Sequence, residues 1–187
     1  FDNIRYTAAF SFDKKDEINT FPSILKTGTE AFKQVYGITS ACFTPPAQEF
    51  PPSLEPTLRQ YGIRYLDRPF YKKRHLGNGN YTHSFSKMGN NGKSNLAFLV
   101  RNVVFEPTNG AIDHVNKAMD QITAAFRMNK PALISSHRVN FCGHIDPKNR
   151  ETGLTALHKL LQNITERWPD VEFMDAAQLG NLIKSET

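Results

Sequence analysis

Apolar residues along this chain recur with two spacings that alternate. Over residues 21–36 they return every three to four positions, which predicts a helix closed by a glycine. Residues 38–43 are rich in β-forming and small residues and predict a strand that stops at two prolines. The same order then returns, with a helix from Ser53 to Gly62 followed by a strand over residues 63–66. Such alternation is typical of a parallel α/β sheet or barrel.

The alternation is interrupted over residues 70–94, which are rich in glycine and asparagine and poor in aliphatic residues. We expect a long irregular loop there, either functional or ordered on the surface. Residues 6–12 predict a short strand ending at Asp13, and residues 95–105 predict a further strand. The length is that of one domain, so we expect a single α/β domain over residues 1–187.

The most informative strand follows a helical pattern over residues 112–128 and stops at His137. A second helical pattern covers residues 150–168, and residues 171–174 predict a last strand. In parallel sheets and barrels, ligands bind at the carboxyl ends of the strands. A histidine there can donate a proton or bind a metal. We therefore expect His137 to be catalytic, with a structural histidine bound to a carbonyl as the alternative.

Other polar residues lie at predicted strand ends or in the loops beside them. Glu106 is a candidate general acid or base, and Asp13 is a carboxylate of the same kind. His144 and Asp146 are candidate metal ligands or an oriented pair, unless they belong to an ordinary loop. The residues expected to bind substrate are Arg101, Asn102, Arg138, Asn140 and Tyr71. The alternatives are a structural Arg101–Glu106 pair and an aromatic anchor for the loop at Tyr71.

Charge and cysteine content narrow the classes of partner. The formal net charge is +5, and part of it is concentrated between Arg68 and His75. That cluster predicts either a polyanion site or a solvated loop, and we expect no nucleic-acid partner because no recognised motif surrounds it. No run of about 18 apolar residues is present, so we expect no transmembrane helix. Cys42 and Cys142 lack metal-ligand spacing, and we expect two free, mostly buried thiols in preference to a disulfide.

The last third of the chain resembles the polysaccharide deacetylases, the NodB-type carbohydrate esterases. Residues 134–137, Ile-Ser-Ser-His, are similar to the Leu-x-x-His motif of that family. A long helix, the strand over residues 171–174 and an Asp-x-x-x-Leu helix from Asp175 follow in the family's order. Residues 37–45 and 62–66 resemble two earlier strands, so the likeness covers residues 32–183.

The resemblance implies a distorted or partial (β/α) barrel of about seven strands that removes acetyl groups from amino sugars. It also implies a divalent metal such as zinc, an extracytoplasmic location, and a general-acid role for His137. The family's His-x-x-x-His metal motif does not occur, and Lys14 follows Asp13 where the family has a second Asp. Two explanations remain: the chain is the C-terminal part of a longer barrel, or the metal site has been lost. The start at Phe1 instead of Met favours the first.

Three functions are therefore open. The first is a carbohydrate-active hydrolase, most simply a polysaccharide deacetylase-like enzyme acting on acylated sugars. The second is a glycoside hydrolase, for which Glu106 with Asp13 or Asp146 supplies the two carboxylates. The third is a carbohydrate-binding module without catalysis.

Overall fold

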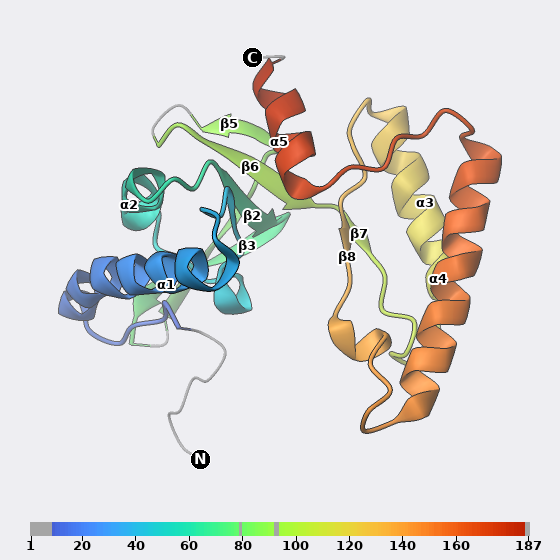
Figure 1. Cartoon of the computed structure of the whole chain (residues 1–187), viewed down its shortest axis with the longest axis horizontal. Helices are drawn as coiled ribbons and strands as arrows, with labels where there is room; N and C mark the ends of the chain where they lie inside the picture. Colours follow the sequence, from blue (N-terminus) through green and yellow to red (C-terminus); the bar gives the residue numbers. More distant parts are fainter. Residues whose placement is uncertain (1–8, 79, 92–93, 186–187) are drawn as a thin grey trace. The chain divides into compact units, whose positions relative to one another are not determined.

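The computed structural model describes residues 9–78, 80–91 and 94–185, which form two compact units (Figure 1). The first unit comprises the described residues up to Val100 together with those from Met174 onward, and the second is Arg101–Phe173. Two separate apolar cores form, one in each unit. The single domain expected over residues 1–187 stays a prediction.

The first unit combines helices with a four-stranded sheet and a two-stranded hairpin. The sheet has the order β1-β2-β6-β5, with β1 and β2 parallel and β5 and β6 antiparallel. Its helices are η1 (Lys15–Thr20), α1 (Phe21–Tyr36), η2 (Pro46–Gln48), η3 (Pro52–Leu54), α2 (Glu55–Gln60) and α5 (Ala176–Ser185). Its strands are β1 (Cys42–Phe43), β2 (Tyr65–Pro69), β3 (Tyr71–Gly77), β4 (Asn80–Phe85), β5 (Gly89–Asn91) and β6 (Leu96–Arg101).

Helix α1 covers residues 21–36, as its sequence spacing predicts. It ends at Gly37, whose φ of 70° lies in the left-handed region that favours glycine. The core of this unit is built around phenylalanines. Phe10 meets Phe21 and Phe50 edge-on, with ring centroids 5.4 and 5.1 Å apart.

The second unit places two helices side by side along a pair of short parallel strands (Figure 1). Its elements are β7 (Val103–Val104), α3 (His114–Arg127), β8 (Ile134–Ser135), η4 (Arg138–Asn140) and α4 (Pro147–Arg167). Val103, Phe105, Ile122 and Leu160 are almost completely buried and form the centre of the core between strands and helices. The described helices of both units include none that is long and apolar enough to cross a membrane.

The mixed α/β class is confirmed, but a closed barrel of about seven strands is wrong for the described residues. They form one four-stranded sheet and two separate two-stranded sheets. Strands β1, β7 and β8 are only two residues long, so they cannot supply the continuous, tilted ladder that closes a barrel. Residues 171–174 form no strand, and the predicted strand over residues 95–105 is divided into β6 and β7.

The irregular loop expected over residues 70–94 is also wrong, because most of it is the antiparallel hairpin β3–β4 followed by β5. Strand β4 is exposed along its whole length, and the rings that alternate along it stand where a half-buried strand has aliphatic residues. The turn begins at Gly77, with φ 94°. A Cβ at Gly77 would lie 2.8 Å from the carbonyl oxygen of Asp13, so glycine is required there. Of the predicted strand 6–12, residues 6–8 lie outside the described residues, and 9–12 form no strand.

Helix α4 passes so close to η4 that its backbone allows no side chain at Gly153. A Cβ built there would lie 1.7 Å from the carbonyl oxygen of Asn140. Gly28 in α1 is the opposite case, with nothing within 4 Å of an added Cβ. The two glycines therefore form a natural test pair.

We expect Gly153→Ala to destabilise the second unit by about 3 kcal/mol, because helix and backbone must separate. Gly28→Ala should leave that unit unchanged and stabilise α1 by about 0.5–1 kcal/mol. The single tryptophan, Trp168, packs against the second unit's core, so urea unfolding followed by its fluorescence reports on this unit. Equal unfolding midpoints for Gly153→Ala and the parent chain would contradict the close approach.

A cluster of charged side chains is buried in the first unit. Arg68 forms an ion pair with Glu55, and Ser94 donates a hydrogen bond of 3.0 Å to the same carboxylate. Lys72 is 4% exposed and donates from Nζ to the carbonyl oxygen of Phe50 at 3.1 Å. Burial, with the nearby positive charge of Arg68, lowers the pKa of Lys72 to about 8.

Because the Lys72 pKa is about 8 when folded and near 10.5 when unfolded, the unfolded chain binds more protons between these values. The free energy of unfolding of the first unit should therefore rise with pH from about pH 8 to about pH 10.5. Below about pH 8 this gain in stability should be absent. Lys72→Met should abolish this part of the pH dependence. The measurement is urea unfolding by circular dichroism at pH 7 and pH 10. A stability difference between the parent and Lys72→Met that is the same at both pH values would refute the prediction.

Candidate active site

Two acid–base residues lie at the same edge of the β7–β8 pair. The strands are parallel and in register at Val104 and Ser135. Glu106 follows Val104 by two positions, and His137 follows Ser135 by two. Because parallel strands in register end together, Glu106 and His137 leave the sheet side by side. This is the edge at which the sequence predicts a site.

The two side chains form a hydrogen-bonded pair. His137 Nδ1 lies 2.7 Å from Glu106 Oε1. The side chain of His137 is 76% exposed, whereas that of Glu106 is only 15% exposed. The carboxylate therefore orients the ring from beneath and engages Nδ1, which leaves Nε2 toward solvent. A histidine held in this way can exchange a proton with a bound molecule through Nε2.

Asn140, in η4, is fully buried and holds this pair in place. Its Nδ2 donates to Glu106 Oε2 at 2.6 Å and to the carbonyl oxygen of His137 at 2.8 Å. Its Oδ1 accepts from the backbone N and the hydroxyl of Thr108, at 3.2 and 2.7 Å. Because Asn140 has no exposed surface, we infer that it positions Glu106, and its substrate-binding role stays a prediction. Sequence reasoning missed Thr108, although a hydroxyl two residues after Glu106 was a usable signal.

The other predicted residues of this unit are placed as follows. Arg101 Nη1 donates to Ser135 Oγ at 2.9 Å, beside the strand end. Asn102 binds the carbonyl oxygen of Pro131 and the backbone N of Leu133, at 2.9 and 2.7 Å. Its side chain thus joins the two strand-entry segments, which accounts for it structurally. Arg138 is exposed in η4. Substrate binding by Arg101 and Arg138 stays a prediction.

The candidate metal ligands do not form a metal site among the described residues. His144 and Asp146 are both exposed, and Asp146 caps α4 by accepting a 3.0 Å hydrogen bond from the backbone N of Lys148. Within residues 9–78, 80–91 and 94–185, no three His, Cys, Asp or Glu side chains gather closely enough to hold a metal. Metal binding by this pair therefore stays a prediction without a complete ligand set.

Asp13 and Tyr71 belong to the first unit. Asp13 is exposed just before η1, and its carbonyl oxygen accepts from the backbone N of Asn78 at 3.1 Å. Tyr71 is half exposed on β3 and stacks on His83. Their catalytic and binding roles stay predictions. Cys42 is half-buried, and Cys142 is exposed, so the expected burial is wrong for Cys142.

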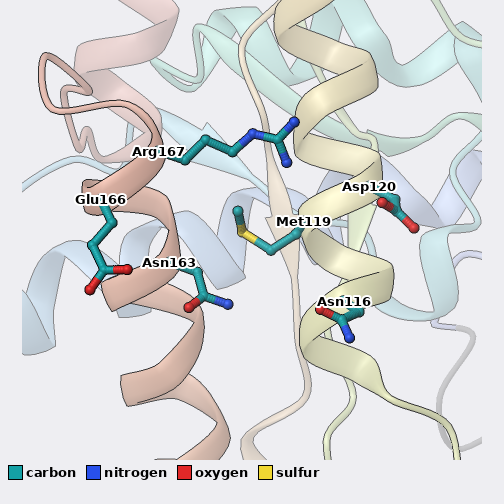
Figure 2. Close-up of a pocket in the computed structure, with 6 residues that line it drawn as sticks. All are labelled: Asn116, Met119, Asp120, Asn163, Glu166 and Arg167. Carbon is teal, nitrogen blue, oxygen red and sulfur yellow. The ribbon is translucent and has the colours of Figure 1, made fainter.

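A pocket of about 580 Å³ lies elsewhere in the second unit, between α3 and α4. Figure 2 shows Arg167 reaching from α4 toward α3, whereas Asp120 and Glu166 point away from each other. The carboxylates do not converge on a common point, so this pocket lacks the geometry of an acid–base or metal site. The Glu106–His137 pair remains the candidate site.

Comparison with known proteins supports the fold. The chain resembles the crystal structure of a candidate polysaccharide deacetylase from Mycobacterium smegmatis, with a TM-score of 0.58 over 90% of this chain. The two sequences are 15% identical, so the likeness concerns the α/β fold alone. This chain spans 57% of the length of that protein. No family model and no curated protein matches the sequence.

The geometry predicts which nitrogen of His137 carries the proton when the ring is neutral. Because Glu106 accepts at Nδ1, the proton should reside there. Nitrogen NMR of labelled protein should show this tautomer in the parent chain and its loss in Glu106→Ala. His158, exposed in α4, is the reference ring and should be unchanged. A His137 tautomer that is insensitive to Glu106→Ala would show that the pair does not form in solution.

Proposed function

We propose that this chain is a carbohydrate deacetylase-like hydrolase in which His137 donates a proton to the leaving group. The observation that carries the proposal is the hydrogen-bonded Glu106–His137 pair at the carboxyl ends of two parallel strands. The similarity of residues 134–137 to the Leu-x-x-His motif and the deacetylase-like fold support it.

Deacetylation of an N-acetylated sugar adds water to the acyl carbon and breaks the C–N bond. The departing amine must gain a proton, since an amide anion is a very poor leaving group. His137 Nε2 supplies that proton, and Glu106 stabilises the ring orientation throughout. The neutral ring, whose proton lies on Nδ1, first takes this proton at Nε2 from the attacking water. The water oxygen then joins the acyl carbon, the C–N bond breaks, and the sugar nitrogen leaves as an amine while the acyl group leaves as acetic acid. The divalent metal implied by the family finds no complete ligand set in the described residues, so no step is assigned to it.

Glu106 is better assigned as a positioning residue than as an acid or base of its own. Its Oε1 is engaged by His137 and its Oε2 by Asn140. With a side chain only 15% exposed, it offers no free oxygen to a sugar. This also weakens the glycoside hydrolase alternative, which needs two carboxylates that both reach the glycosidic bond.

We expect His137→Ala to lower kcat for acetate release from N-acetylglucosamine oligomers by about 10²–10⁴-fold. The assay uses the purified chain with and without added zinc. Glu106→Gln should lower kcat less, because the ring keeps its catalytic nitrogen but loses the carboxylate that orients it. His158→Ala is the matched control and should leave kcat within twofold of the parent.

Unchanged turnover in His137→Ala would refute the proposed role. Saturable binding of the oligomers without acetate release, with and without zinc, would favour the binding-module alternative.

A further inference from the structure

The hairpin β3–β4 presents an aromatic face to solvent. Its register pairs Tyr71 with Phe85, Lys73 with His83, and His75 with Tyr81. Directly paired residues point to the same side of a sheet, so these side chains share one face. Tyr71, Phe85 and Tyr81 are 51%, 69% and 40% exposed. Contiguous exposed aromatic groups of this kind mark interaction surfaces.

The rings on this face hold one another in fixed positions. Tyr71 stacks on His83 with centroids 5.0 Å apart and planes inclined by 8°. Phe85 lies 5.5 Å from Tyr71, and Tyr81 lies 4.8 Å from His75. Phe12 in turn packs edge-on against His75 at 5.0 Å, which ties the hairpin to the core of the first unit. A platform ordered before binding loses little conformational entropy when a ligand arrives.

The same face carries a positive charge at Lys73. Lys73 lies on the aromatic face, with Nζ 5.9 Å from the ring centroid of Tyr81, whereas Arg74 alternates to the opposite face of the hairpin. No acidic residue occurs between Asp67 and Glu106. That interval contains seven basic residues: Arg68, Lys72, Lys73, Arg74, Lys87, Lys93 and Arg101. Arg68 is paired with Glu55 and Lys72 is buried, so a ligand on the aromatic face meets the ammonium group of Lys73.

We propose that this face, formed by Tyr71, Lys73, Tyr81, His83 and Phe85, binds a glycan that carries carboxylate or sulfate groups. The C–H face of a sugar ring lies flat on the exposed aromatic rings, and its anionic substituent pairs with Lys73. A single-stranded nucleic acid fits less well. It needs separated ring faces for successive bases, whereas Tyr71, His83 and Phe85 are gathered into one cluster.

This surface is distinct from the proposed catalytic pair, because the hairpin belongs to the first unit and His137 to the second. The proposal therefore does not depend on deacetylation. It gives the chain a preference for anionic polysaccharide that the Glu106–His137 pair does not itself provide.

The test is calorimetric titration of the whole chain with an oligogalacturonate, a neutral cello-oligosaccharide of equal length, and oligo(dT). Tyr71→Ala should weaken oligogalacturonate binding about tenfold, the effect of losing one stacked ring, and Tyr71→Phe should retain it. Lys73→Ala should weaken binding several-fold and reduce its dependence on salt. Tyr36→Ala is the matched control, because Tyr36 is also exposed and pairs with Phe32 at 4.6 Å, but on α1.

We expect the oligogalacturonate to bind more tightly than the neutral oligomer, and His137→Ala to bind it as the parent does. No binding of oligogalacturonate, or equal loss in Tyr71→Ala and Tyr36→Ala, would overturn the proposal. Tighter binding of oligo(dT) that is also lost in Tyr71→Ala would reassign the face to nucleic acid.

Discussion

The buried side chain of Asn140 is the constraint on which the second unit's chemistry depends. It joins Glu106 after β7 to the backbone of His137 after β8, while Thr108 saturates its oxygen. A buried amide left without these partners would be costly, so the two strand ends are kept together. Because Gly153 has no side chain, helix α4 can pack closely against Asn140 and cover it. The close packing of α4 on η4 and the geometry of the Glu106–His137 pair therefore depend on the same residue, Asn140.

The two side chains of the Glu106–His137 pair differ in exposure, and we infer that they have different roles. Glu106 is nearly buried and has both oxygens engaged, whereas His137 is largely exposed. The Glu106 carboxylate orients the His137 ring, and Nε2 of that ring is the atom left to contact a bound molecule. The charged cluster of the first unit differs, because Lys72 and Glu55 are both buried among protein groups. Such a cluster serves folding specificity better than contact with a ligand.

The sequence predicted an element correctly where that element has regular apolar spacing. Helix α1 and its closing Gly37 were predicted closely, since a regular apolar face and a glycine are local signals. The hairpin β3–β4 was missed although Tyr81, His83 and Phe85 alternate with polar residues, because strand β4 contains no aliphatic residue and is exposed along its whole length. The barrel was predicted from the helix–strand alternation and from resemblance. Neither specifies how long a strand's hydrogen-bonded ladder becomes, and β7 and β8 stop after two residues.

The sequence by itself determined that His137 ends a strand between two helices and that Glu106 ends another, because strand ends are set by short-range patterns. It also determined the basic, acid-free interval that includes the hairpin. Only the tertiary structure decided that Glu106 and His137 are partners and that Asn140 lies beneath them. It alone gathered Tyr71, His83 and Phe85 on one face. Strand register and ring packing join residues distant in the chain, and no local pattern encodes which distant groups will meet.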